Sequence, residues 1–204
     1  MKELYFVRHG QTEWNAIRRM QGQMNSNLND RGRAQADVNG QFLATRNIEA
    51  LFASPLDRTR QTAEIVNQHL SLPIAFDERI MEWDCGDWSG HMYDEIRERW
   101  SEEWTNWRAD PFSYRGPGCE NYPDMINRSR PFLAELSKHP AERIAIVSHG
   151  MIGRVMVSTM LEHDAATTLS YGQDNDVIFR VTLSENETAV DRFIGGNGPE
   201  PGLQ

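Results

Sequence analysis

The sequence predicts an α/β fold, a three-layer sandwich with a mostly parallel sheet, one antiparallel edge strand and helices on both faces. Three short apolar runs, at residues 4–7, 50–53 and 144–147, carry this prediction. Continuous apolar runs of this length are typical of parallel strands that are covered on both faces. A helical pattern follows each run, which is the signature of βαβ units.

The helix after the second run has a well-marked start. Ser54 is its expected N-cap and Pro55 its first helical residue. Arg58 and Thr62 lie four residues apart and therefore share one face of this helix. Arg60 lies about 200° further round the helix than Arg58, so the two arginines cannot face the same site.

A tryptophan-rich pattern fills the middle of the chain. Aromatic and apolar residues recur there at helical spacing: Tyr93, Ile96, Trp100, Trp104 and Trp107. We interpret this stripe as the packed face of a helix. The alternative is an aromatic lid that selects the substrate.

The last third of the chain adds a helix and a hairpin. The helix is expected from Asn121 to about Leu136, with Pro123 in its first turn. Residues 177–183 alternate in polarity and are expected to pair with residues 188–194 as a hairpin. Residues 195–204 are expected to form a frayed tail. No repeat or long linker divides the sequence, so residues 1–204 are expected to form a single domain.

Composition restricts the classes of partner. The chain has 204 residues and a net charge of -9, which disfavours nonspecific binding to nucleic acid or to acidic membranes. An acidic protein binds an anion only through a local cluster of positive groups. The sequence shows no signal peptide and no apolar run of membrane-spanning length, and Cys85 and Cys119 fall in no metal or redox spacing. We therefore expect a cytoplasmic protein, and a homodimer is compatible with its size.

Two His-Gly pairs each follow a predicted strand. Arg8-His9-Gly10 ends the first run, and Ser148-His149-Gly150 ends the third and precedes a helix. Ligands of open α/β sheets bind beyond the carboxyl ends of strands, and a helix N-terminus there favours an anion. A neutral imidazole can attack phosphorus without a metal. A single His-Gly pair is more often only a polar strand end. Two such pairs, each after a predicted strand, favour a functional site.

Arg58 is the third candidate at this edge of the sheet. It lies in the first turn of the helix that follows the second run. Its planar guanidinium matches the oxygens of a phosphate group. The alternative is a solvated surface charge, which is the commoner fate of an arginine.

Taken together, these segments resemble the histidine phosphatase superfamily (phosphoglycerate mutase-like, branch 1). The resemblance covers residues 3 to about 195. Residues 21–22 and 28–32 match the family's continuation after its first histidine, whereas Cys119-Glu120-Asn121 replaces the common Gly-Glu-Ser. Separate motifs occur in the family's order: Arg8-His9-Gly10 with Asn15, Ser54-Pro55-Leu56 with Arg58 and Thr62, Glu82 with Gly86, Trp88 and Gly90, and Ser148-His149-Gly150 with Arg154.

The resemblance implies a role for each matched residue. His9 would accept the phosphoryl group, while Arg8, Arg58 and His149 would bind its oxygens. Glu82 would protonate the leaving oxygen and then activate the water that hydrolyses the phosphohistidine. Four groups would complete the phosphate cradle: Asn15, Gln21, Gly22 and the backbone of Gly150.

Glu82 has local competitors in Glu78 and Asp84. Its spacing to the glycines and tryptophan of the motif selects Glu82, although Asp84 would share its face in an extended segment. Away from His9 and His149 and their neighbouring arginines, no segment clusters carboxylates and histidines at ligand spacing, so no metal or other cofactor is expected.

The function expected from this resemblance is a phosphatase acting on a small phosphorylated metabolite through a phosphohistidine. A phosphoglycerate mutase is the alternative, although mutases of this family carry longer middle and C-terminal regions. A catalytically idle module that binds phosphorylated ligands is a third hypothesis. Such a module would have no need of Glu82.

Overall fold

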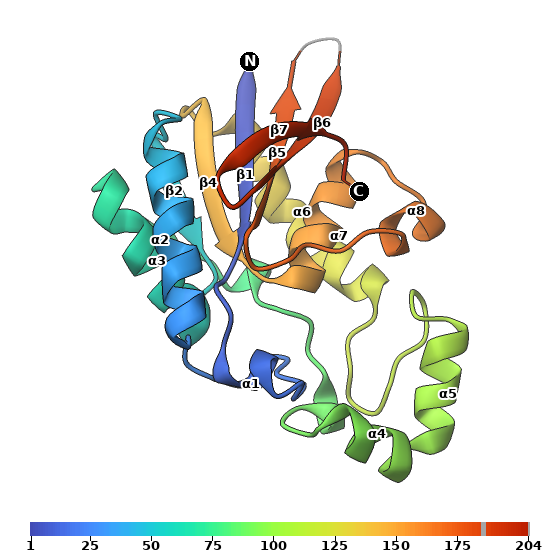
Figure 1. The fold of residues 1–204 in the computed structure, drawn as a ribbon. Helices are drawn as coiled ribbons and strands as arrows, with labels where there is room; N and C mark the ends of the chain where they lie inside the picture. The colour runs from blue at the N-terminus through green and yellow to red at the C-terminus, as the bar shows by residue number, and fades with distance from the viewer. Residues whose placement is uncertain (185–186, 204) are drawn as a thin grey trace.

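A seven-stranded mixed sheet runs through the centre of the protein (Figure 1). The structure is a computed structural model that describes residues 1–184 and 187–203. The strand order is β3-β2-β4-β1-β5-β6-β7, with β3, β2, β4 and β1 parallel and each later neighbour antiparallel. The predicted fold class is confirmed. The strands are β1 (Lys2–Arg8), β2 (Ala50–Ala53), β3 (Ile74–Phe76), β4 (Arg143–Ser148), β5 (Val177–Leu183), β6 (Thr188–Ile194) and β7 (Asn197–Pro201).

Helices cover both faces of this sheet. Figure 1 shows α2 and α3 on one face and α6 and α7 on the other. In the described part of the chain, no helix is long and apolar enough to cross a bilayer. The α-helices are α1 (Glu13–Ala16), α2 (Asp30–Ala44), α3 (Asp57–Leu70), α4 (Tyr93–Arg99), α5 (Ser101–Ala109), α6 (Tyr122–Lys138), α7 (Gly150–Met160) and α8 (Ala165–Leu169), and two 3₁₀ turns are η1 (Glu78–Ile80) and η2 (Gly86–Trp88).

The central strand β1 explains why both faces are covered. Leu4 and Phe6 belong to the apolar cluster beneath α6 and α7, whereas Tyr5 and Val7 belong to the cluster beneath α2 and α3. All four side chains are buried. Because successive residues of a strand point to opposite faces, the continuous apolar run requires a helical layer on each side.

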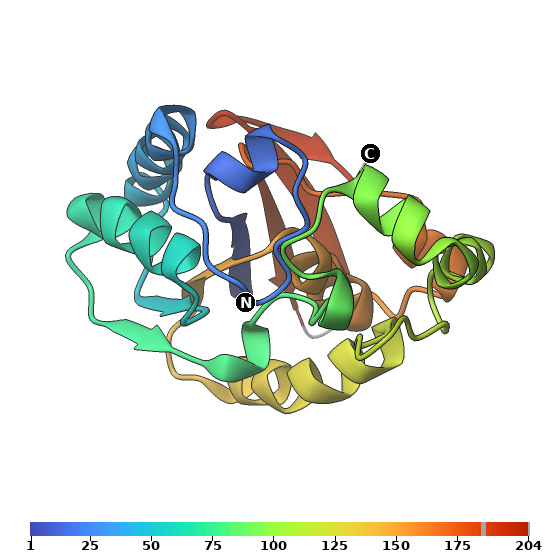
Figure 2. The same ribbon diagram turned by 90° about the horizontal axis from the view of Figure 1, so that it is seen from below.

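The parallel strands direct their carboxyl ends toward one edge of the molecule. Figure 2 views this edge, where α1 and α4 lie near the end of β1. A close backbone approach there brings the start of α2 against the loop after β1. A Cβ on Gly10 would lie 2.1 Å from the carbonyl oxygen of Gly32, so the site requires glycine.

The start of α3 differs from the prediction. The helix begins at Asp57 and its N-cap is Leu56, which makes no side-chain capping bond. Ser54 lies three residues before the helix, and its hydroxyl is bonded to His149 instead. The position of Ser54 after a strand predicted an N-cap. In the structure its hydroxyl instead pairs with the buried imidazole of His149.

The tryptophan-rich pattern forms two helices. The chain turns at Trp100 (φ -124°, ψ 50°), which separates α4 from α5. Trp104 and Trp107 then lie against Trp88, with ring centroids 5.8 and 6.1 Å apart. The stripe is therefore a packing surface. The predicted helix α6 is confirmed, with Asn121 as its N-cap.

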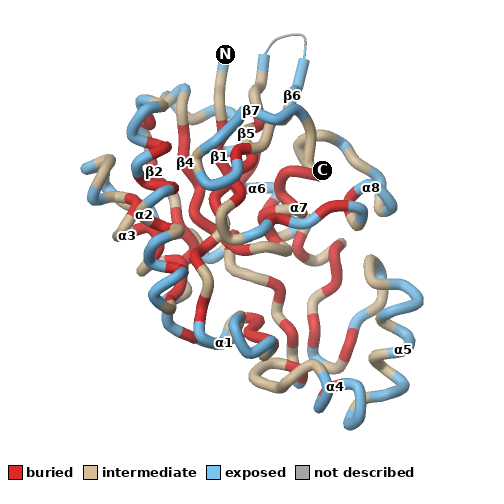
Figure 3. Tube along the Cα trace, viewed as in Figure 1, coloured by how far each residue is buried: buried red, intermediate tan, exposed pale blue. Residues whose placement is uncertain are grey.

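The C-terminal region has one strand more than expected. The antiparallel pairing of β5 with β6 is confirmed. The expected frayed tail is wrong over Asn197–Pro201, which pairs with β6 as β7. All five residues of β7 are exposed (Figure 3), so the strand left no apolar pattern in the sequence. Besides the backbone pairing, Nε of Arg192 in β6 donates to Glu200 at 2.8 Å. Residues 185–186 of the predicted turn and Gln204 lie outside the described residues.

Candidate active site

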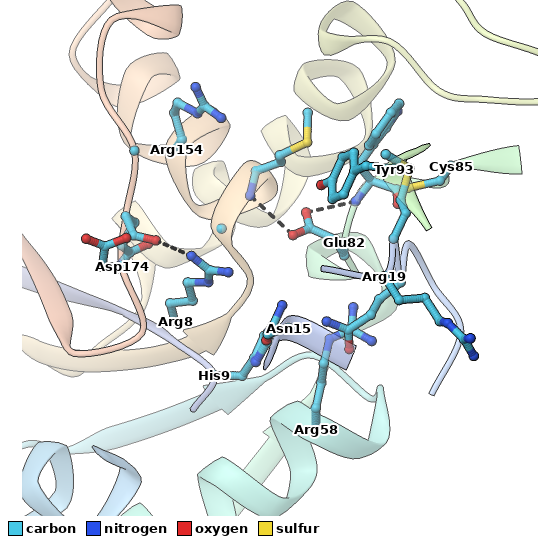
Figure 4. Close-up of a pocket in the computed structure, with 17 residues that line it drawn as sticks. Arg8, His9, Asn15, Arg19, Arg58, Glu82, Cys85, Tyr93, Arg154 and Asp174 are labelled. Atoms are coloured by element: carbon cyan, nitrogen blue, oxygen red, sulfur yellow. Dashed lines mark hydrogen bonds between the residues drawn. The ribbon is translucent and has the colours of Figure 1, made fainter. Parts of the chain in front are cut away.

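A pocket of about 260 Å³ opens where β1 and β4 end and α3 and α7 begin. Figure 4 shows side chains from these elements converging on it. Of the residues predicted from the sequence, seven line this pocket: Arg8, His9, Asn15, Gln21, Arg58, Glu82 and Gly150. His149 and Gly22 lie behind the lining and contact Arg58.

The His9 ring is buried and fixed in one tautomer. Its Nδ1 lies 2.7 Å from the carbonyl oxygen of Gly10. A carbonyl only accepts, so Nδ1 carries the proton and Nε2 keeps its lone pair. The side-chain amide of Asn175 also donates to the backbone carbonyl of His9 at 2.7 Å. Burial, and then the charges of Arg58 and Arg8, hold the pKa of His9 well below its ordinary value, so the ring is neutral.

The second histidine, His149, is also buried and neutral. Nε of Arg58 donates to its Nδ1 at 3.2 Å, so the proton of His149 is on Nε2, which donates to Ser54 Oγ at 2.8 Å. Burial, followed by the charge of Arg58, lowers the pKa of His149 well below its ordinary value. The centroids of the His9 and His149 rings are 5.3 Å apart. Both ring nitrogens of His149 are therefore engaged by protein groups.

Arg58 is held at three points. Besides His149, its guanidinium donates to the carbonyl oxygens of Gly22 at 2.6 Å and Met24 at 2.7 Å. Burial lowers the pKa of Arg58 to about 10. At that value the group is still a cation near neutral pH. Gly22 thus acts by orienting Arg58, which the sequence did not predict.

The two arginines of α3 face opposite ways, as predicted. Arg58 is 1% exposed and lines the pocket. Arg60 instead donates to the carbonyl of Pro55 and lies over the ring of Phe76, 4.0 Å from its centroid. Thr62, on the face of Arg58, accepts a hydrogen bond from the amide of Gly10 at 3.1 Å. This face therefore supports the His9 loop.

Arg8 approaches the pocket from the end of β1. Its Nη1 donates to the carbonyl oxygen of Gln173 at 2.6 Å. The Gln173 side chain in turn donates to the carbonyls of Phe6 and Val177, at 2.8 and 2.9 Å. Burial lowers the pKa of Arg8, and the charge of Glu82 opposes that shift. The loop before β5 is thus tied to the end of β1.

Glu82 lies against the N-terminus of α7. Its Oε1 accepts from the amides of Trp83 and Ile152, at 2.9 and 3.1 Å, and Oε2 accepts from Met151 at 3.2 Å. The carboxylate therefore occupies the anion position that a helix N-terminus offers. These bonds hold both oxygens at the N-terminus of α7, which begins at Gly150.

The nearby acid Asp84 does not share this position. Its carboxylate accepts from the amide of Gly86 at 2.9 Å, and its own amide donates to Glu120. The expectation that Asp84 would face the same way as Glu82 is wrong, because the chain turns into η2 directly after it. Among the acids considered from sequence, the pocket lining includes Glu82 alone.

Asn15 closes the near side of the pocket. It forms a capping box with Thr12 at the start of α1, in which its side-chain oxygen accepts from the Thr12 amide at 3.1 Å. Gln21 Oε1 accepts from the Thr12 hydroxyl at 3.1 Å. These bonds hold both amide side chains at the pocket wall.

Comparison with known proteins agrees with this geometry. Residues 4–194 match the family model of the histidine phosphatase superfamily (branch 1). The chain is 31% identical over 191 residues to phosphoserine phosphatase 1 of Hydrogenobacter thermophilus, covering 93% of this chain and 90% of that protein. This chain belongs to the histidine phosphatase superfamily.

Other known proteins are similar to this chain over nearly their whole length. A probable phosphoglycerate mutase, GpmB, of Salmonella choleraesuis is 34% identical over 198 residues, which cover 95% of this chain and 91% of that protein. A solved mycobacterial glucosyl-3-phosphoglycerate phosphatase superposes with a TM-score of 0.83 at 27% identity, covering 95% of this chain and 98% of the other. A putative α-ribazole-5'-P phosphatase from Escherichia coli, 20% identical, shares the fold with a TM-score of 0.86, covering 95% and 97%.

Sequence reasoning did not assign the remaining lining residues of this histidine phosphatase to the site. Gln173 and Asp174 precede β5, which is antiparallel to β1, so their loop lies beside the end of β1. The predicted strand 177–183 would have placed Gln173 and Asp174 at the site if its pairing with β1 had been known from the sequence. The residues not assigned were Arg19, Met20, Trp83, Cys85, Tyr93, Met151, Arg154, Gly172, Gln173 and Asp174.

Proposed function

We propose that this protein is a phosphatase that hydrolyses a small phosphorylated metabolite through a phosphohistidine at His9. The observation that carries the proposal is the hydrogen bond from His9 Nδ1 to the Gly10 carbonyl, which leaves the Nε2 lone pair free in a pocket lined by Arg8 and Arg58. The names of the relatives, which include phosphatases of phosphoserine and of glucosyl-3-phosphoglycerate, support this class of substrate.

The first step transfers the phosphoryl group. Nε2 of His9 attacks phosphorus while the bond to the leaving oxygen breaks, and the carboxyl of Glu82 donates a proton to that oxygen. The alcohol then leaves, and His9 carries the phosphoryl group.

The second step returns the enzyme to its starting state. Water attacks the phosphohistidine while the Glu82 carboxylate takes its proton, the bond from Nε2 to phosphorus breaks, and inorganic phosphate leaves. The proton on Nδ1, which is donated to the Gly10 carbonyl, lets the ring leave as a neutral imidazole. One water is consumed and one phosphate is released in each cycle.

Arg8 and Arg58 supply the charge that phosphoryl transfer requires. Carbonyl groups hold both guanidinium groups in place before substrate arrives. Each contact between an arginine and a phosphoryl oxygen provides about 4 kcal/mol of attraction at 4 Å with an effective dielectric near 20. Such preorganised charge is the main source of catalysis in this reaction class. Direct contact of His149 with the phosphoryl group stays a prediction.

The proposal includes two further parts. The reaction needs no metal, because attack by a neutral imidazole requires none. Its setting is the cytoplasm, where the free thiols of Cys85 and Cys119 stay reduced. Phosphoglycerate mutase activity is the alternative, since it uses the same phosphohistidine and differs in the acceptor.

Phosphate release and phosphohistidine trapping test this proposal together. The purified protein is assayed against p-nitrophenyl phosphate and a panel of phosphorylated sugars, glycerates and amino acids, with and without a chelator. We expect phosphate release that the chelator leaves unchanged, and an acid-labile, base-stable phosphoprotein under rapid quenching. Transfer to a second hydroxyl without phosphate release would favour the mutase. Loss of activity on chelation, restored by one divalent metal, would contradict the metal-independent step.

A further inference from the structure

The segment that carries Glu82 is an irregular stretch of chain. Residues 81–85 run between the 3₁₀ turns η1 and η2. The backbone carbonyls of such a stretch need partners from elsewhere in the fold, because a buried carbonyl without a partner is costly. A proton donor also needs an accurate position, since a misplacement of about 1 Å can cost roughly 10²-fold in rate. What holds this stretch therefore decides where Glu82 stands.

Arg128 of α6 binds the backbone around Glu82. Its Nη1 donates to the carbonyl oxygens of Arg79 and Met81, both at 2.9 Å, and its Nη2 lies 3.4 Å from the carbonyl oxygen of Glu82. The side chain of Gln23 donates to the same Glu82 carbonyl at 3.0 Å. Arg128 lies outside the set of described residues that line the pocket. Its contacts are thus with the chain that carries the acid.

Glu120 orients Arg128 and also binds the segment itself. Its carboxylate accepts from Nε and Nη2 of Arg128 at 2.8 and 2.7 Å, the two-bond geometry that fixes a guanidinium plane. The same carboxylate accepts from the amide of Asp84 at 3.0 Å. The Glu120 backbone donates to the Asp84 carbonyl at 2.9 Å and accepts from the indole of Trp83 at 2.6 Å. The two charged side chains are only 20% and 21% exposed, so the pair is more than a solvated surface contact.

We propose that Arg128 and Glu120 are positioning residues for the general acid. They hold the backbone on both sides of Glu82, while amides of α7 hold its carboxylate. With the side chain fixed at both ends, the carboxyl meets the leaving oxygen in one geometry. Their role rests on the proposed phosphatase mechanism, in which Glu82 gives its proton to that oxygen.

An ion pair on the same helix provides a matched control. Glu135 of α6 accepts two hydrogen bonds of 2.7 Å from the guanidinium of Arg79, so it also ties α6 to the chain before Glu82. Its side chain is exposed, and these bonds reach the Arg79 side chain and not the backbone of residues 81–84. Removal of Glu135 therefore separates a general link to α6 from the link to the backbone around Glu82.

Single-turnover kinetics on two esters test the role of Arg128. Arg128→Lys keeps the charge opposite Glu120 but loses the planar fork that reaches several carbonyls. Its rate should fall roughly 10- to 100-fold on an alkyl phosphate, less than the roughly 10²–10⁴ of a lost general acid, and only a few-fold on nitrophenyl phosphate. Glu120→Gln should act in the same direction, and Glu135→Gln should leave both rates unchanged. Enzyme in excess over substrate keeps an unfolded fraction of any variant out of the rate constant.

A double variant separates positioning from general damage to the fold. Arg128→Lys should add little to the loss on the alkyl ester once Glu82→Gln is present, because the proton donor is already gone. The proposal is overturned if Arg128→Lys leaves the alkyl-ester rate unchanged or slows both esters equally, if the two losses multiply in the double variant, or if Glu135→Gln shows the same leaving-group dependence. Without phosphate release by the wild type, or without leaving-group dependence in Glu82→Gln, the proposed function itself fails. With both, the outcome concerns Arg128 and Glu120 alone.

Discussion

The two ends of the pocket are built in different ways. At the phosphoryl end, His9, Arg58 and His149 are at most 3% exposed, and each is held by named hydrogen bonds. At the mouth, Arg154 is half-buried and Asp174 is exposed, and neither has an ion pair among the described residues. The phosphoryl end is therefore held rigidly for one chemical group, whereas the mouth keeps polar side chains available to a ligand.

This contrast separates chemistry from specificity. A transferred phosphoryl group has the same charge and shape in every substrate, so its site gains from donors that are oriented in advance. The relatives are named for different esters, such as phosphoserine and glucosyl-3-phosphoglycerate, so under the proposed function we expect the mouth to select the ester. Substitutions at the phosphoryl end should therefore slow every substrate, whereas those at the mouth should change the order of substrates.

His9→Ala should abolish catalysis at the phosphoryl end of the pocket. Without the nucleophile no covalent intermediate forms, and we expect turnover of every ester to fall by more than about 10⁴-fold. Steady-state assays and phosphoprotein trapping measure this loss. Substantial turnover by His9→Ala would remove the basis of the proposed mechanism.

Glu82→Gln should have the next largest effect, and its size should depend on the leaving group. An alkyl alcohol is a poor leaving group that needs a proton, whereas nitrophenol leaves as a stable phenolate. Loss of a general acid costs roughly 10²–10⁴ in rate, so the single-turnover rate should fall by that factor on an alkyl phosphate and much less on nitrophenyl phosphate.

Asp84→Asn is the control for Glu82, because Asp84 is two residues away and its carboxylate caps Gly86 instead. It should show no dependence on the leaving group. Equal slowing of both esters by Glu82→Gln would mean that Glu82 does not donate the proton. Leaving-group dependence in Asp84→Asn would assign the acid to the other carboxylate.

Arg58→Ala should cost about 10²–10³ in turnover, the usual size for removing one preorganised charge donor. The loss should be similar for every ester, because Arg58 belongs to the phosphoryl end. Arg60→Ala, on the opposite face of α3, should change turnover little. Steady-state kinetics on both variants measure the ranking, and the reverse ranking would contradict the placement of α3.

The sequence predicted the phosphoryl end better than the mouth for a physical reason. His9 and His149 each follow a buried strand within one or two residues, so a short motif and the rule for parallel sheets were enough. Arg19 and Asp174 reach the pocket from loops that lie far apart in the chain. Nothing in their local sequence shows which neighbours they meet, because tertiary packing brings these loops together.

The errors of local prediction have identifiable physical causes. Ser54 was expected to cap α3, but its hydroxyl accepts from His149, which is 95 residues away. Asp84 was expected to share the face of Glu82, but a glycine at φ +48° turns the chain after it. β7 left no apolar pattern, because all five of its residues are exposed; backbone pairing and the Arg192–Glu200 ion pair join it to β6. A distant partner thus accounts for the error at Ser54, whereas local backbone geometry accounts for the error at Asp84.

The burial of two neutral histidines at the phosphoryl end should also make the fold sensitive to acid. The pKa values of His9 and His149 are both lowered in the folded protein, first by burial and then by Arg58. Above the ordinary histidine pKa of about 6.5 both states are neutral, so the stabilisation is complete. As the pH falls through 6.5 toward the lower folded values, the unfolded chain takes up protons that the folded chain does not. The free energy of unfolding should then fall by about 1.4 kcal/mol per pH unit for each histidine.

Urea unfolding between pH 7.5 and 5 measures this slope. His9→Asn removes one of the two groups and should reduce the slope by about 1.4 kcal/mol per pH unit relative to the wild type, since every other titrating group contributes equally to both proteins. An unchanged slope in His9→Asn would mean that His9 takes up a proton in the folded state. It would then be a cation with no lone pair for phosphorus, so the same measurement also tests whether the nucleophile is ready below neutral pH.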